Sequence, residues 1–113
     1  MITIKRIYEP KSPNDGYRVL VDRLWPRGVS KDKAAIDLWM KDIGPSNELR
    51  KWFNHDPKKW LEFQKRYEVV LKSKTDELDS LRRLEKEHRT VTMLYGARDQ
   101  QHNEAVVIAG MLS

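Results

Sequence analysis

The stretch YRVLVDRLWPRG, residues 17–28, decides which fold to expect. Its centre, Val19-Leu20-Val21, is apolar at every position, and a strand that is apolar on both faces is typical of a parallel sheet covered by helices on both sides. The polar tail that follows contains a proline and a glycine, which end the strand. We therefore expect a buried strand over residues 17–24 that delivers charged side chains to one edge of a sheet.

Apolar patterns elsewhere in the chain predict further strands. The N-terminal pattern places Ile2, Ile4 and Tyr8 on one side of an extended segment. The other expected strands cover residues 2–8 and 90–97, with a short strand within 35–41 as a weaker alternative. Because helical patterns separate these strands, we expect a small layered α/β domain with a short, largely parallel sheet flanked by helices.

Helix signals lie between and after the strands. Ser46 is suited to cap a first helix, and Asp56 to cap a second one with Pro57 in its first turn. A helix running unbroken from Pro57 to residue 87 would be roughly 46 Å long, which is too long for a domain of this size. Ser73 and Asp76 have the spacing of a capping box, so we place a break there. The expected helices are 47–54, 57–72, 75–87 and 102–112, and 29–34 is an expected polar loop.

The composition bounds the classes of protein to consider. A length of 113 residues fits one domain, residues 1–113, and the absence of cysteine excludes disulfides, thiolate catalysis and cysteine-bound metals. The first residues lack a signal-peptide pattern and no apolar run has transmembrane length, so we expect a cytoplasmic protein without a membrane partner. The net charge of +5 favours an anionic partner, although the positive excess is spread evenly over both halves of the chain.

Charged and aromatic side chains follow two of the predicted strands. Crossovers between parallel strands are right-handed, so the carboxyl ends of both strands meet at one edge of the sheet, where open α/β sheets bind ligands. The start of the last helix offers backbone N–H groups at the same edge, and arginine is well suited to bidentate contact with phosphate or carboxylate. The two clusters are Asp22, Arg23, Trp25 and Arg27 after the first strand, and Arg98, Asp99, His102 and Asn103 after the second.

The same residues allow a purely structural interpretation. Asp22 and Asp99 can pair with the neighbouring arginines, and Asp99 or Gln100 can cap the last helix. Trp25 can cover the core as a lid. Only the convergence of the two clusters favours a ligand site over these roles.

Three motifs resemble the YeaO-like family, which is domain of unknown function number 488. They are VDRLWPRGVSK, GPSNELRKWFNHDPKKWLEFQKRY and VTMLYGARDQQHNEAVVI, in that order along nearly the whole chain. The resemblance implies a small α/β domain and no established activity. It marks the positions Asp22, Arg23, Trp25, Pro26, Arg27, Gly28, Ser46, Arg50, Trp52, His55, Arg98, Asp99, His102 and Asn103. The chain departs from the family pattern at Gly44 and Gly96, where alanine is usual.

These observations predict a site for a small ligand that carries phosphate or carboxylate. The expected ligand-binding residues are Asp22, Arg23, Trp25, Arg27, Ser46, Arg50, Arg98 and Asn103. If a reaction occurs, Asp99, His102 and His55 are the expected proton-transfer residues. Whether the protein is an enzyme stays open, because it has no nucleophile motif and no glycine-rich phosphate loop. No cofactor is expected.

Three other functions remain as alternatives. A nucleic-acid-binding or regulatory role would use the lysines and arginines of the long helices, although glutamates and aspartates lie among them at ion-pairing spacing. A metal site would use His55, His102 and Asp99. A partner-binding module would use the four tryptophans, whose positions instead suggest core and pocket wall.

Overall fold

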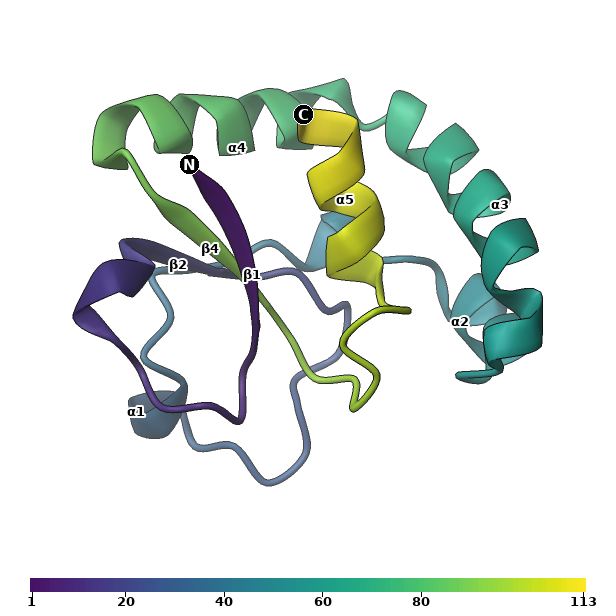
Figure 1. Ribbon diagram of the computed structural model, residues 1–113, viewed down its shortest axis with the longest axis horizontal. Helices are drawn as coiled ribbons and strands as arrows, with labels where there is room; N and C mark the ends of the chain where they lie inside the picture. The colour runs from purple at the N-terminus through teal and green to yellow at the C-terminus, as the bar shows by residue number, and fades with distance from the viewer.

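A sheet of four parallel strands forms the centre of the protein in a computed structural model that describes residues 1–113 (Figure 1). The spatial order is β1-β4-β2-β3, and every neighbouring pair is parallel. This confirms the predicted α/β class, including the weaker alternative of a strand within 35–41. The strands are β1 (Ile2–Arg6), β2 (Tyr17–Leu20), β3 (Leu38–Trp39) and β4 (Val91–Tyr95).

Helices cover one face of this sheet. Val19, Val21 and Met93 point from the two central strands into the main core, where they meet buried side chains such as Phe63 and Tyr67. Figure 1 shows the two long helices meeting at a bend, with α5 crossing beside them. The helices are α2 (Asn47–Phe53), α3 (Trp60–Lys72), α4 (Thr75–His88) and α5 (Glu104–Leu112), and none is long and apolar enough to cross a membrane.

The opposite face of the sheet is covered mainly by loops. Leu20 and Leu94 point into a second, smaller core with Ile7 and with Ala34 from the single-turn helix α1 (Lys31–Ala34). The expectation that the central strand is apolar on both faces is therefore confirmed. The expected helical cover on both faces is only partly met, and α1 stands where a polar loop was expected.

The predicted helix boundaries are mostly confirmed. Ser46 accepts a hydrogen bond from the backbone N–H of Leu49, and Asp56 accepts one from that of Lys58, at the start of the 3-10 turn Pro57–Lys59. The break between α3 and α4 lies where it was predicted. The predicted capping box there is wrong, because the Ser73 hydroxyl donates to the carbonyl of Val70 and α4 starts without a side-chain cap.

The strands predicted over 2–8, 17–24 and 90–97 are all shorter in the structure, and this leaves their tails free at the carboxyl edge of the sheet. β1 ends at Arg6, so Tyr8 lies outside the sheet with 46% of its surface exposed. The ladder of β2 ends at Leu20, although the backbone N–H of Val21 still donates to the carbonyl of Leu94. The chain from Asp22 onward is therefore free to curve across the edge.

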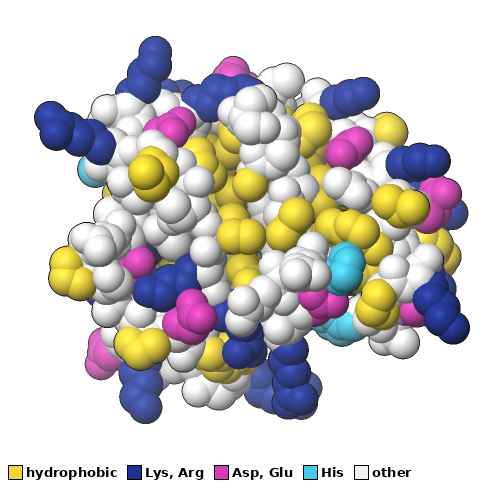
Figure 2. Space-filling model, viewed as in Figure 1, with side chains coloured by type: hydrophobic (Ala, Val, Ile, Leu, Met, Phe, Trp, Pro, Cys, Tyr) yellow, Lys and Arg dark blue, Asp and Glu magenta, His cyan; other side chains and the backbone are white.

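Figure 2 shows how charge is distributed over the face seen in Figure 1. Lys and Arg side chains lie around the margin of this face with Asp and Glu among them, and hydrophobic side chains cross its middle. Arg66 pairs with Glu62, and Arg82 pairs with Asp79. Nucleic-acid-binding surfaces usually gather their cations in one patch or stripe. The helix cations on this face are not arranged in that way.

Arg18 is the one fully buried charged side chain, with 0% of its surface exposed. It lies on β2, and its side chain points to the face of the sheet that loops and the short helix α1 cover. Its guanidinium pairs with Asp15 and donates to the carbonyls of Ala34 and Ala35. Burial alone would raise the pKa of Asp15, but hydrogen bonds from the Ser12 backbone and from nearby cations outweigh it and lower this pKa. The network attaches the loop-covered face to the sheet.

Replacing Arg18 should destabilise the protein strongly. In Arg18→Met, two buried backbone carbonyls would lose their donor and Asp15 would keep only Lys5 and the Ser12 backbone N–H, so we expect the free energy of unfolding to fall by about 3 kcal/mol. Urea denaturation followed by circular dichroism measures this change. The control is Arg66→Ala, which removes an exposed ion pair and should cost less than about 1 kcal/mol. Equal losses in the two variants would contradict the assigned role of Arg18.

Candidate functional site

A pocket of about 480 Å³ lies at the carboxyl edge of the sheet. The loop after β2 forms one wall of this pocket, and α2 with the residues that follow it forms the opposite wall. The residues after β4 and the start of α5 also line it, together with Tyr8 after β1 and Phe63 of α3. The parallel order of the strands thus brings together segments that are far apart in the chain, as the sequence predicts.

Four cationic side chains line the pocket: Arg23, Arg27, Arg50 and Lys51. Arg23 donates from Nε to the carbonyl of Pro45 at 2.9 Å and from Nη2 to that of Gly44 at 2.8 Å, so much of its guanidinium is occupied within the chain. Arg50 makes a hydrogen bond only with exposed Asn47, and the side chains of Arg27 and Lys51 make none. Arg27, Arg50 and Lys51 therefore keep donors for a ligand.

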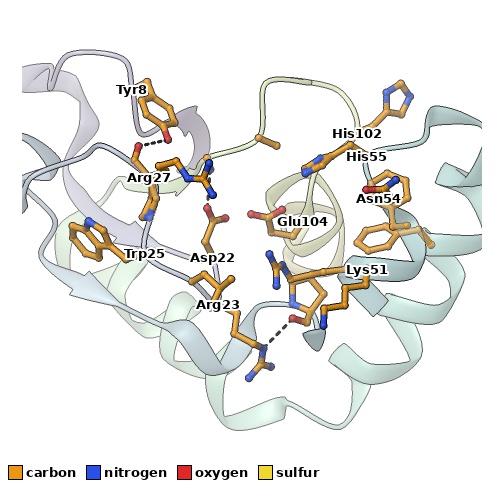
Figure 3. Close-up of a pocket in the computed structure, with 18 residues that line it drawn as sticks. Tyr8, Asp22, Arg23, Trp25, Arg27, Lys51, Asn54, His55, His102 and Glu104 are labelled. Carbon is orange, nitrogen blue, oxygen red and sulfur yellow. Dashed lines mark hydrogen bonds between the residues drawn. The ribbon is translucent and has the colours of Figure 1, made fainter. Parts of the chain in front are cut away.

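Two carboxyl groups meet in the middle of the pocket. Figure 3 shows those of Asp22 and Glu104 facing each other, with Tyr8 and Arg27 to one side and Lys51 to the other. Oδ2 of Asp22 accepts a hydrogen bond from the backbone N–H of Gly96 at 2.9 Å. Oδ1 of Asp22 is buried and has no hydrogen-bond partner. If both carboxyls were ionised, this oxygen of Asp22 would have no hydrogen-bond donor.

The surroundings of Glu104 favour its protonated form. Burial raises its pKa well above the ordinary value of 4.5, and the neighbouring carboxyl of Asp22 raises it further. The positive charge of Arg50 opposes this effect but does not overcome it. When Glu104 is protonated, the pocket lining carries four cationic side chains against one carboxylate, Asp22. The proton on Glu104 therefore increases the positive charge of the site.

His102 reaches the pocket with its ring held by Asp99. Nδ1 of His102 lies 2.8 Å from Oδ2 of Asp99, and the ring packs edge-on against Trp60 with 5.1 Å between centroids. The pKa of Asp99 is lowered, first by the hydrogen bond to the His102 side chain and then by backbone N–H donors. Asp99 itself does not line the pocket. It orients the imidazole so that Nε2 is the nitrogen left for other partners.

The backbone at the rim of the pocket is strained. Asn54 and His55 follow α2 with φ values of 48° and 53°, in the left-handed region that side chains other than glycine rarely adopt. Asn54 ends the helix in this conformation, which asparagine tolerates well. His55 is the second consecutive left-handed residue, and the chain turns there. The side chains of Asn54 and His55 both line the pocket.

The structure brings most of the sequence-predicted site residues together, but not all of them. Asn103 is buried and caps α5, where its Oδ1 accepts from the backbone N–H of Val106. Ser46 caps α2, and Arg98 is exposed beside the pocket without lining it. The predicted residues that line the pocket are Asp22, Arg23, Trp25, Arg27, Arg50, His55 and His102, and those that do not are Ser46, Arg98, Asp99 and Asn103.

The structural roles weighed for these residues are also revised. Asp22 does not pair with Arg23, and Asp99 pairs with His102 rather than with an arginine. The cap of α5 is Asn103, so the expectation that Asp99 or Gln100 caps it is wrong. No group of three or more metal-ligating side chains comes together, so the alternative of a metal site at His55, His102 and Asp99 has no geometry to support it.

Sequence reasoning missed four polar residues of the pocket lining. The clearest is Glu104, whose signal is that it is the only charged residue in the otherwise apolar helix α5. Tyr8 was expected within a strand, but it lies at the pocket rim and its hydroxyl donates to the carbonyl of Arg27 at 2.8 Å. Lys51 and Asn54 stand next to residues that the family pattern marks.

The proton on Glu104 gives a testable pH dependence. Above pH 4.5 the unfolded chain releases this proton while the folded chain keeps it, so the Glu104 contribution to the free energy of unfolding falls as pH rises toward the raised pKa. Glu104→Gln removes this loss. We expect the variant to be more stable than wild type at pH 8, with the difference shrinking toward pH 4.

Urea denaturation at several pH values measures this difference. The matched control is Glu9→Gln, which removes an exposed glutamate from a loop and should give the same small difference at every pH. A pH-independent difference between Glu104→Gln and wild type would contradict the raised pKa.

Comparison with known proteins places this chain in a family. Residues 1–113 match the family described as "Inactive DUF488-N3 subclade". The uncharacterised protein YeaO of Escherichia coli K12 is 41% identical over 111 residues, covering 98% of this chain and 96% of that protein. The uncharacterised protein Rv3073c of Mycobacterium tuberculosis H37Rv is 39% identical over 112 residues, covering 99% and 93%. No solved structure shows a significant match. The chain therefore belongs to the YeaO-like DUF488 family.

Proposed function

We propose that the protein binds a small anionic ligand, carrying phosphate or carboxylate, in the pocket at the carboxyl edge of its sheet. The observation that carries this proposal is the excess of positive charge in the lining, where Arg23, Arg27, Arg50 and Lys51 face a single ionised carboxylate when Glu104 is protonated. Donors on Arg27, Arg50 and Lys51 that have no strong partner in the chain are available for an anion.

Binding without catalysis fits this site better than an enzymatic role. The family match carries the description "inactive", and the lining contains no cysteine or serine to act as a nucleophile. On this proposal His102 is a hydrogen-bond donor or acceptor to the ligand, held in orientation by Asp99. His55 lines the pocket on the side of α2 and offers a further hydrogen-bonding group.

The proposal predicts that phosphate esters and small carboxylates raise the melting temperature of the protein. Binding to the folded state alone stabilises it, and isothermal titration calorimetry then gives the dissociation constant. Arg50→Ala removes a cation from the lining. We expect it to weaken binding of the same anion by about tenfold, the size of one charged hydrogen bond.

Two variants serve as controls for this experiment. Arg83→Ala removes an exposed arginine from α4, far from the lining, and should bind like wild type. Arg98→Ala should also bind like wild type, because Arg98 does not line the pocket although the sequence pattern predicts it as a ligand-binding residue. If no phosphate or carboxylate compound raises the melting temperature, or if Arg83→Ala loses as much affinity as Arg50→Ala, the proposal fails.

The alternative of a nucleic-acid-binding or regulatory role has weaker support. Its basis is the net charge of +5, but Arg66 and Arg82 are engaged in ion pairs and the cations on the face in Figure 2 are dispersed. A gel-shift titration over salt concentration separates the two roles. Contacts to many phosphates would give a steep loss of affinity with salt, whereas a one-anion pocket would not retain DNA or RNA.

A further inference from the structure

We propose that the pair formed by Asp22 and Glu104 recognises a hydroxyl group on the ligand, so that the pocket selects a hydroxylated anion rather than a bare one. This inference rests on the proposed function above and narrows the class of ligand to molecules such as polyol phosphates and hydroxy acids. It assigns Glu104 as a specificity-determining residue.

Asp22 carries one buried oxygen that lacks a hydrogen-bond partner. A buried carboxylate oxygen without a donor is costly, and Oδ1 of Asp22 has none although Oδ2 is satisfied by Gly96. The group that faces it is the carboxyl of Glu104. One proton held between the two carboxyls supplies the missing donor and removes the repulsion of two like charges.

The charged groups around the pair are consistent with a single shared proton. Arg50 lowers the pKa of Glu104, but its one side-chain hydrogen bond goes to Asn47, and Arg23 donates to two backbone carbonyls. Arg27 and Lys51 line the same pocket, and neither donates a hydrogen bond to Asp22 or Glu104. The buried hydroxyl of Tyr67 donates to the carbonyl of Ile43 at 2.6 Å, so it is not free to satisfy Asp22. None of these groups replaces the proton.

The oxygen of Glu104 that does not face Asp22 is available to a ligand in the pocket. Glu104 lines the pocket, and its protonated carboxyl offers a ligand a neutral hydrogen-bond acceptor. A ligand ammonium group is disfavoured here, because it would enter a pocket lined by four cationic side chains. A second anionic group is disfavoured at this position because it has no hydrogen to donate to the acceptor oxygen of Glu104. An uncharged donor remains, and in small anionic molecules the common one is a hydroxyl.

The size and layout of the pocket suit a ligand larger than a phosphate ion. Its volume of about 480 Å³ lies in the range of small-molecule sites and greatly exceeds that of a phosphate ion. Figure 3 shows the carboxyl pair in the middle, between Arg27 on one wall and Lys51 on the other. A ligand whose anionic group meets either cation therefore extends past Glu104, where a hydroxyl can donate to it.

Matched phosphate esters test this inference. Isothermal titration calorimetry at pH 7.5 compares wild-type binding of n-propyl phosphate, glycerol 3-phosphate and ribose 5-phosphate. The first two share chain length and charge and differ by two hydroxyls. We expect at least one hydroxylated ester to bind about fivefold or more tightly than n-propyl phosphate, the gain from one or two additional hydrogen bonds.

Variants at Glu104 assign the preference to the carboxyl pair. Glu104→Gln keeps a neutral acceptor beside Asp22 and should retain the preference. Glu104→Leu removes the acceptor and should bind the three esters with equal affinity, whatever its affinity for n-propyl phosphate. A preference that survives in Glu104→Leu would overturn the assignment.

The wild-type comparison decides the inference even if Glu104→Leu does not fold. If all three esters bind wild type equally, hydroxyl recognition is wrong while the anion-binding proposal stands. If none of the esters binds, and inorganic phosphate and carboxylates also leave the melting temperature unchanged, the anion-binding proposal itself is wrong.

Discussion

The parallel pairing of β2 with β4 is the constraint on which the rest of the structure depends. Val19 lies opposite Met93 and Leu20 opposite Leu94, and all four side chains are fully buried. Because the strands run in the same direction, the polar segments that follow them leave the sheet at one edge. Asp22 and Gly96, 74 positions apart in the chain, are hydrogen-bonded there. The pocket exists because this contact joins the two exits.

The sequence was sufficient to predict the layers and the edge, but not the direction of each side chain. Apolar runs such as residues 91–95 mark buried strands, and parallel topology then implies where their ends lie. By contrast, Asn103 and Ser46 were expected at the ligand, and both side chains are used by helix N-termini instead. A sequence shows which residue types are present. It does not show which backbone N–H groups compete for them.

Glu104 illustrates a second limit. An acidic residue in the first turn of a helix is ordinary, since it interacts favourably with the helix dipole, and the apolar residues that follow Glu104 do not show which group its carboxyl will face. Its raised pKa comes first from burial and then from Asp22, and both arise only after the sheet has formed. The same holds for His102, whose orientation follows from its contact with Asp99 and Trp60. Electrostatic properties of this kind belong to the tertiary structure rather than to the motif.

Arg23 links the two walls of the pocket, since it leaves the loop after β2 and bonds the carbonyls of Gly44 and Pro45 ahead of α2. Gly44 permits this approach, because a Cβ atom there would lie 2.8 Å from the Arg23 backbone nitrogen. The cations of both walls are thereby held at a set spacing against their mutual repulsion. Under the proposed function the site is preorganised: an arriving anion would act as the missing counterion, and little of its binding free energy would be spent on rearranging the walls.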